Sequence, residues 1–445
     1  MIGSAQPPAQ SPDLGWVGAA AAPTTGRHIV VFADTDIDAA SMMRTEAGMT
    51  SIATSRDFEG AAIDVSQTEA ADATVFSELG IAVMSADPSQ FSALQKVAAS
   101  GERIVSISPE LINHVMPGQS ADYAGGYADG VADLVARLGS GQSIPDASEP
   151  PLTPGREQPP FADTAQATWG LQATGVISSP YSGRGVRVAV LDTGFDATHP
   201  DFLGRQVTLQ SFVAGEAPQD GHGHGTHCVG TSCGPRMPET GRRYGVAYEA
   251  DIFVGKVLSD GGSGGDAGVL AGINWAVANG CQVISMSLGS DFPQVHPPYV
   301  AAGRRALNRG SLIVAAAGNN ADRRVGNFGF VGPPANSPAV VAVGALEQQL
   351  AVAYFSARSL AATRGGQVDL AAPGWQVYSS WPMPTRYRSI SGTSMATPHV
   401  AGLAALWAQQ TGLRGRELWA TLTQEDTRLL APSADVGGGL PLAPQ

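Results

Sequence analysis

Three residue types that together perform nucleophilic catalysis stand at informative places in this sequence. Asp192 ends the apolar run GVRVAVLD, His224 lies in GHGHGTHCVG, and Ser394 lies in SGTSMATPHVAG. A serine hydroxyl is a weak nucleophile unless a base accepts its proton, and an imidazole oriented by a carboxylate is such a base. Asn319, which ends SLIVAAAGN, offers an amide that can donate to a developing oxyanion. These residues predict acyl transfer, provided that the fold brings them together.

The elements around these residues predict an α/β domain over residues 163–430. Five near-continuous apolar runs are typical of strands buried on both faces: GVRVAVLD, DIFVGKVL, QVISMSLG, SLIVAAAGN and AVVAVGAL. Helical stretches lie between them, including one that Asp266 is expected to cap. This alternation predicts three layers, with helices on both faces of a central, mostly parallel sheet. In open parallel sheets, sites lie beyond the carboxyl ends of the strands, where Asp192 and Asn319 are expected.

Residues 27–108 carry a different pattern. The runs RHIVVFA, EGAAIDV, GIAVMSA and ERIVSIS are strand-like, and two helical stretches give the order strand–helix–strand–strand–helix–strand. That order predicts a small ferredoxin-like α+β unit. We expect residues 1–26 to form a flexible leader and residues 431–445 a flexible tail. Residues 109–162 should hold a helix over 121–138 and then an exposed Pro/Gly-rich linker.

The composition excludes several classes of protein. The 445 residues are 43% hydrophobic and 15% charged, so most of the chain can bury a core. Residues 1–162 hold 20 acidic and 7 basic side chains, and residues 163–445 hold 19 of each. Nucleic acid is therefore not an expected partner, because phosphate binding needs clustered Lys and Arg. No run of 18 apolar residues occurs, so no membrane span is expected, and three cysteines cannot form a disulfide framework.

The sequence blocks that hold these candidate residues resemble those of the subtilisin-like serine proteases, the subtilases. They stand in that family's order: VAVLDTGFDATHPDF, GHGHGTHCVGT, SMSLG, AAAGN and SGTSMATPHVAG. HGTHC and GTSMATPHVAGLAAL look most similar to the proteinase K branch. The resemblance covers roughly residues 163–425 and implies a subtilisin-like fold. It also implies an endopeptidase with Asp192, His224 and Ser394 as catalytic triad, and an oxyanion hole made by Asn319 and the Ser394 backbone N–H.

The resemblance further implies where an extended peptide substrate would bind. Two glycine-containing segments resemble the pair that sandwiches a substrate strand in the family. The residues implied in substrate binding are Gly262, Ser263, Gly264, Ser287, Leu288, Gly289, Ala316, Gly318 and Gly332. An uncharged first pocket, left deep by Gly332 at its base, implies a preference for large apolar side chains before the cut bond. Turn geometry is the alternative explanation for these glycines.

No cofactor is expected for the chemistry itself, but the resemblance implies a structural calcium ion. Its ligands would be the Asp369 side chain and the backbone carbonyls of Pro338 and Val340, because oxygen ligands suit Ca²⁺. A simple turn role for Asp369 is the alternative. A second calcium site of the family is matched by Asp201 alone.

The amino-terminal unit loosely resembles the prodomain of these proteases. This implies a zymogen whose own prodomain binds it in cis or trans, and a maturation cut within 109–165. We expect peptide or protein substrates and a monomer. The family implies secretion, whereas the leader lacks the basic start and apolar core of a signal peptide, which leaves a cytoplasmic location open.

Several alternatives stay open at this level. The same triad would also serve a precursor-specific processing peptidase or a peptide ligase, and the chain would be a silent binding protein if the triad did not form. Three nearby histidines, His222, His224 and His227, also raise the alternative of a zinc site. We expect instead that His222 is a solvated loop residue and that His227 is a structural residue of a helix. Cys228, one helical turn after His224, is either core packing or a reactive thiol.

Overall fold

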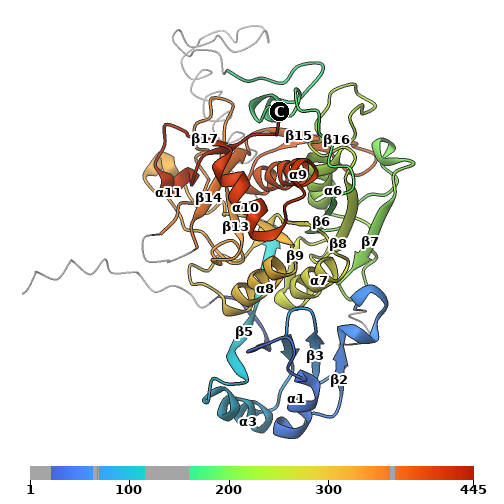
Figure 1. Ribbon diagram of the computed structural model, residues 1–445, viewed down its shortest axis with the longest axis vertical. Coiled ribbons are helices and arrows are strands. Elements are labelled where there is room, and N and C mark those ends of the chain that lie inside the picture. The colour runs from blue at the N-terminus through green and yellow to red at the C-terminus, as the bar shows by residue number, and fades with distance from the viewer. Residues whose placement is uncertain (1–21, 64–67, 69, 116–159, 361–365) are drawn as a thin grey trace, which may run out of the picture.

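A parallel sheet forms the centre of the carboxyl-terminal unit (Figure 1). The protein is described here by a computed structural model, which covers residues 22–63, 68, 70–115, 160–360 and 366–445. In this part of the chain the sheet has seven strands, all parallel. Their order is β14 (Val368–Pro373), β13 (Val341–Leu346), β12 (Leu312–Ala316), β10 (Val283–Met286), β6 (Arg187–Asp192), β8 (Asp251–Lys256) and β7 (Val207–Ser211).

Helices cover both faces of this sheet. Successive side chains of a strand point to opposite faces, so Val188 and Val190 of β6 join one core cluster and Ala189 and Leu191 join another. The first cluster includes residues of α6 (His224–Cys233), α9 (Thr393–Thr411) and α10 (Gly415–Gln424). The second includes residues of α7 (Asp266–Ala278) and α8 (Pro297–Asn308). The predicted three-layer α/β domain is therefore confirmed.

Short elements complete this unit. They are α5 (Trp169–Ala173), η3 (Pro200–Phe202), β9 (Ser263–Gly265), β11 (Leu288–Gly289), η4 (Arg323–Val325), β15 (Val377–Ser380), β16 (Tyr387–Ile390), β17 (Asp426–Thr427), α11 (Ser433–Val436) and β18 (Leu440–Pro441). β15 pairs with β16, and β17 with β18, both antiparallel. Among the described helices, none combines the length and the apolar character that crossing a membrane requires.

The carboxyl-terminal residues are packed, so the expectation of a flexible tail over 431–445 was wrong. Leu440 and Ala443 are 2% and 3% exposed. The Leu442 carbonyl accepts a hydrogen bond from Trp407 Nε1 at 2.8 Å. Gly437 and Gly439 adopt positive φ angles, which lets the chain turn and return its apolar residues to the core.

The strands of the amino-terminal unit belong to a second sheet, which has helices on one side (Figure 1). Its elements are β1 (Thr24–Phe32), α1 (Ala39–Ala47), β2 (Ile52–Thr54), η1 (Ser55–Asp57), η2 (Glu59–Ala61), β3 (Ala73–Phe76), β4 (Ile81–Met84), α3 (Pro88–Ala98) and β5 (Ile104–Val115). The strand order is β5-β1-β4-β3-β2, antiparallel except for the β2–β3 pair. The first four strands in this list have the order of a ferredoxin-like unit, with β2 as an added edge strand.

Three local expectations for this unit were wrong. The run EGAAIDV begins with η2 instead of a strand, because Gly60 and Ala61 have positive φ angles; β3 takes the place expected for it. β1 begins at Thr24, inside the expected leader 1–26. β5 continues to Val115, so the boundary expected after residue 108 falls within a strand. The helix expected over 121–138 and most of the linker lie outside the described residues.

The two units pack closely together. Helices α1 and α3 pack on one face of the amino-terminal sheet. Residues on the other face, such as Ile29, Ile81 and Val83, pack in the same core cluster as residues of α7 and α8. Glu110 of β5, fully buried, accepts a hydrogen bond from the Ala267 backbone N–H in the first turn of α7 at 2.8 Å. This carboxylate therefore satisfies a free N–H group of a helix start in the other unit.

Candidate active site

Three elements of the carboxyl-terminal unit bring Asp192, His224 and Ser394 to the carboxyl edge of the parallel sheet. Asp192 is the last residue of β6, His224 the first of α6, and Ser394 the second of α9. Gly223, just before α6, has a φ of 104°. A Cβ atom there would lie 2.3 Å from the Trp381 ring, so only glycine lets the chain enter this helix.

The side chains of Asp192 and His224 form a buried hydrogen-bonded pair. His224 Nδ1 lies 2.8 Å from Asp192 Oδ1, and the residues are 5% and 0% exposed. Burial by itself lowers the pKa of His224, but the neighbouring Asp192 carboxylate, assisted by Cys228, raises it well above 6.5. His224 Nε2 has no hydrogen-bond partner among the described residues. The ring is therefore oriented through one nitrogen, while the other is available to exchange a proton.

Ser394 is fixed at the start of α9 by hydrogen bonds with Ser287. Ser394 Oγ lies 3.2 Å from the Ser287 carbonyl oxygen, and Ser287 Oγ donates to the Ser394 carbonyl at 2.7 Å. Cys228 Sγ lies 3.7 Å from the Ser394 carbonyl and 3.8 Å from His224 Nδ1. The Cys228 thiol thus contacts both residues, and it links the start of α6 to the start of α9 directly behind His224 and Ser394.

The amide of Asn319 is oriented by the residue before Ser394. The Thr393 backbone N–H and its hydroxyl both donate to Asn319 Oδ1, each at 2.9 Å. The oxygen end of the amide is therefore engaged, which makes Nδ2 the end that serves as donor. Asn319 follows β12 and is buried, so this donor is held by the scaffold.

The two glycine-containing segments lie on either side of β5. On one side, β11 pairs antiparallel with β5 through Leu288↔Val115 and Gly289↔His114. On the other side, β9 pairs antiparallel with it through Gly264↔Asn113 and Ser263↔His114. The Val115 backbone N–H donates to the Gly262 carbonyl at 2.9 Å. A strand of this chain thus fills the position that the sequence assigned to a substrate strand.

The remaining residues expected in a substrate pocket lie on strands or loops near the same edge. Ala316 ends β12, and Gly318 follows with a φ of 125°. A Cβ atom on Gly332 would lie 2.2 Å from the Ser290 carbonyl, so this glycine is required by a close backbone approach. Gly332 thus positions Ser290, just after β11, in addition to any effect on pocket depth.

Comparison with known proteins agrees with this fold. Residues 183–437 match the family described as the subtilase family, peptidase S8. The chain belongs to the subtilase family. Subtilisin DY of Bacillus licheniformis is 40% identical over 237 residues, 53% of this chain and 81% of that protein. Thermitase of Thermoactinomyces vulgaris is 42% identical over 229 residues, 51% of this chain and 76% of that protein.

A fungal relative matches over a similar stretch. The cuticle-degrading protease of Metarhizium anisopliae is 38% identical over 260 residues, 55% of this chain and 61% of that protein. The family and these relatives make the present subtilase a hydrolase, a serine endopeptidase of the subtilisin type. Subtilases need no cofactor for catalysis.

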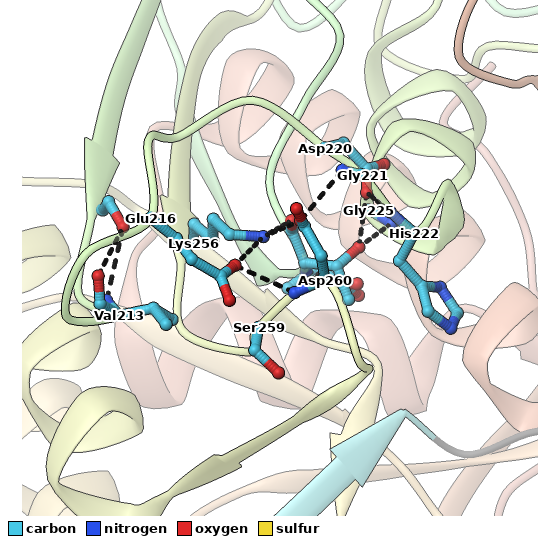
Figure 2. A network of polar contacts seen from close by, with 12 residues as sticks. Val213, Glu216, Asp220, Gly221, His222, Gly225, Lys256, Ser259 and Asp260 are labelled. Carbon is cyan, nitrogen blue, oxygen red and sulfur yellow. Dashed lines mark hydrogen bonds and ion pairs between the residues drawn. The ribbon is translucent and has the colours of Figure 1, made fainter.

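A buried lysine of the subtilase, which sequence reasoning missed, ties the loop before α6 to the segment after β8 (Figure 2). Lys256 pairs with Asp192 in the register of β6 and β8 and is fully buried. Its Nζ lies 2.6 Å from Asp260 Oδ1, 2.6 Å from the Thr193 carbonyl and 3.2 Å from a Glu216 carboxylate oxygen. A charged residue at the end of an otherwise apolar strand run is the signal that would have found it.

Asp220 is a second missed residue, and it secures the start of α6. Asp220 Oδ1 accepts from the Gly223 N–H at 2.8 Å, and Asp220 Oδ2 accepts from the Thr226 N–H at 2.8 Å. These bonds satisfy N–H groups at the helix start that carries His224. Asp260, in turn, accepts from the Gly221 N–H at 3.0 Å (Figure 2).

The other histidines and the cysteines have separate surroundings. His227 Nε2 lies 2.9 Å from the Val377 carbonyl, and burial lowers the pKa of His227 to about 3. Among the described residues, the one group of His, Cys, Asp or Glu close enough to share a metal ion is Asp192, His224 and Cys228. Burial raises the pKa of the Cys228 thiol, so it is held neutral.

The surroundings of Asp369 bear on its expected role as a calcium ligand. This residue of β14 is partly buried beside β13, with Oδ2 accepting from the Ala342 N–H at 2.8 Å. Burial raises the pKa of Asp369 to about 7. In the described part of the chain no basic side chain pairs with it, and its second carboxylate oxygen is of the ligand type that Ca²⁺ accepts. The donor chemistry fits Ca²⁺.

Proposed function

We propose that this subtilase is made as a zymogen and hydrolyses peptide bonds with Ser394, His224 and Asp192. The proposal rests on the position of β5, which lies as a strand between β9 and β11. β5 runs toward Ser287, which is hydrogen-bonded to Ser394. Extended peptides bind sheet edges through such main-chain pairing. The cleft is therefore shaped for a peptide backbone that ends at the nucleophile.

In the proposed mechanism each residue has one task. His224 Nε2 takes the proton of Ser394 Oγ as this oxygen attacks the peptide carbonyl carbon. Asp192 stabilises the imidazolium through Nδ1. The Ser394 N–H at the start of α9 and Asn319 Nδ2 donate to the oxyanion. His224 then protonates the leaving amine, and water hydrolyses the acyl-enzyme by the reverse roles.

The amino-terminal unit acts as the inhibitory prodomain in this proposal. Two contacts outside the cleft support this role: Glu110 at the start of α7, and Arg305 of α8, whose guanidinium donates to carbonyls of Phe32, Leu79 and Gly80. A unit docked at these places keeps β5 in the cleft. Because β5 leads toward Ser394, we expect the maturation cut soon after Val115, within the range 109–165.

Three finer features belong to the same proposal. The uncharged residues Ser287, Leu288, Ala316 and Gly318 favour large apolar side chains before the cut bond. Asp369, with the carbonyls of Pro338 and Val340, would hold a calcium ion that stabilises the fold. The thiol of Cys228 behind His224 supports a placement in the proteinase K branch. We further propose that the enzyme acts as a monomer on peptides or proteins.

Labelling with a fluorophosphonate probe tests the proposed nucleophile. We expect the full chain, after incubation, to form a covalent adduct that Ser394→Ala lacks. The amino-terminal sequence of each sample reports processing, which we expect only in the wild type. A wild type that neither labels nor processes would overturn the proposal. Mass spectrometry of products from mixed peptides then shows whether hydrolysis or ligation follows acylation.

A further inference from the structure

A polar pocket holds the side chain of Asn113, which lies in β5 before the end of the strand that approaches Ser394. Asn113 is fully buried, and its backbone pairs with Gly264 of β9, two residues before Val115. Three residues of the carboxyl-terminal unit contact its side chain, namely Asp266, Ser290 and Tyr299, and His296 contacts Asp266. We call these four residues the Asn113 pocket. Of these, only Asp266 entered the sequence analysis, where it was expected to cap a helix.

Asp266 is the centre of the pocket and does not cap α7. It is the first residue of that helix, is fully buried, and follows the N-cap residue Gly265. Its Oδ1 accepts from Tyr299 Oη at 2.6 Å, and its Oδ2 lies 3.0 Å from His296 Nε2. Burial and the Asp266 carboxylate raise the pKa of Tyr299, so this phenol stays a donor. The start of α8 therefore orients the carboxylate toward β5.

β5 completes the hydrogen bonding of this carboxylate. Asn113 Nδ2 donates to Asp266 Oδ1 at 2.7 Å, and the Leu111 N–H donates to Asp266 Oδ2 at 2.7 Å. At the other end of the amide, Ser290 Oγ lies 3.2 Å from Asn113 Oδ1. Asp266 thus gives the NH₂ group a buried acceptor. The Ser290 hydroxyl, which lies closer to the Ile112 carbonyl at 2.8 Å, divides its one donor hydrogen between that oxygen and the amide oxygen.

We propose that the Asn113 pocket makes this endopeptidase select asparagine at the substrate position that Asn113 occupies. The inference rests on the proposed function, because it treats β5 as a stand-in for a substrate. An aspartate there would bring a second carboxylate against Asp266, and a leucine would leave the carboxylate without one of its donors. Sites built around such hydrogen bonds reject analogues that lack them more strongly than apolar pockets reject a change of size.

Three fluorogenic peptides test the selection. Each has the sequence of residues 111–116 followed by a fluorogenic amide, with Asn113 kept or with Asn113→Leu or Asn113→Asp. The enzyme is the full chain, incubated until its own processing is complete. We expect kcat/KM for the asparagine peptide to exceed that for the leucine peptide by about 10–100-fold, and that for the aspartate peptide by more.

An enzyme variant tests whether Asp266 causes the preference. In Asp266→Asn, the aspartate peptide should gain most and approach the asparagine peptide, because the repulsion is gone. The control is Asp251→Asn, an exposed acid at the start of β8, which should keep the wild-type order. Equal kcat/KM for the three peptides on the wild type overturns the inference, and this result stands even if Asp266→Asn does not fold.

A failure of the proposed peptidase activity would give a different result from a failure of the selection. In that case the wild type hydrolyses none of the three peptides faster than Ser394→Ala does. Hydrolysis of all three at similar rates leaves the peptidase intact and removes only the selection.

Discussion

At the scale of single residues, His224 is subject to two opposing electrostatic effects. Its burial disfavours the charged ring, but the Asp192 carboxylate 2.8 Å away favours it and dominates, so the pKa of His224 is raised. The Nε2 atom can accept the proton of Ser394 only while the ring is neutral. Asp192 therefore improves the strength of the base but moves its working range to higher pH.

The pH dependence of the processed enzyme follows from this shift. We expect kcat/KM to rise with pH as one proton is lost, with a midpoint above 6.5, because protonated His224 cannot act as base. In Asp192→Asn the midpoint should move to lower pH, and the plateau should fall by about 10⁴-fold, the magnitude known for this change in such triads. Rates with one peptide from pH 5 to 10 measure both. A midpoint that does not move would contradict the assignment of this pair.

Asn319→Ala removes the side-chain donor of the oxyanion hole. We expect kcat to fall by about 10²–10³-fold, the magnitude known from subtilisin itself, with KM little changed. Asn320→Ala is the control, because Asn320 is adjacent but donates to the Phe330 carbonyl instead. Turnover of the two processed variants with one peptide decides the matter, and an unchanged kcat would exclude Asn319 from the mechanism.

At the scale of elements, α7 and α8 serve both units. They cover one face of the parallel sheet, and their outer sides pack against the amino-terminal sheet. Arg305 of α8 donates to three carbonyls at the ends of β1 and β4, none of which belongs to β5, β9 or β11. The docking of the amino-terminal unit can therefore be weakened without changing a residue that contacts a substrate.

Arg305→Ala should release the amino-terminal unit sooner after processing. Several hydrogen bonds from a charged group are lost, so we expect the dissociation constant of the unit to rise by about 10–100-fold. Arg304→Ala is the matched control, because Arg304 is adjacent and exposed. The delay before peptide hydrolysis begins is the readout, and equal delays in both variants would contradict the inhibitory role of the docked unit.

At the scale of the whole molecule, residues 431–445 connect separate parts of the carboxyl-terminal unit. Asp435 of α11, 2% exposed, binds Arg323 at 2.6 Å and Arg358 at 2.6 Å. These two arginines lie before β13 and before β14, so one carboxylate joins three separate parts of the chain. Despite the opposing effect of burial, hydrogen bonds from Arg358 and Arg323 lower the pKa of Asp435.

Asp435→Asn should therefore destabilise the fold. Removal of one partner from a buried ion pair leaves uncompensated charge, and we expect a loss of about 3 kcal/mol in the free energy of unfolding. Thermal unfolding in a Ser394→Ala background, which prevents self-digestion, gives the measurement, with Asp251→Asn as the control. A melting temperature equal to that of the control would contradict a stabilising role of the Asp435 ion pairs.

The strands of the parallel sheet and the motif blocks of this subtilase could be predicted from the sequence, because both are local features. A strand buried on both faces needs a continuous apolar run, and the residues proposed for catalysis, such as Asp192 and Asn319, follow such runs directly. What the sequence misjudged locally, the tail and the run EGAAIDV, depended on turn conformations at Gly437 and Gly60.

The occupant of the cleft could not be predicted from the sequence, because it depends on how distant segments pack. β5 lies between β9 and β11, and Asn113 meets Asp266 across 153 residues of chain. The hydrophobic pattern of a strand or helix predicts which of its faces is buried, but it does not identify the element that packs against that face. The chemistry of the Asn113 pocket, built from the starts of two helices and a strand of the other unit, exists only after those elements have packed.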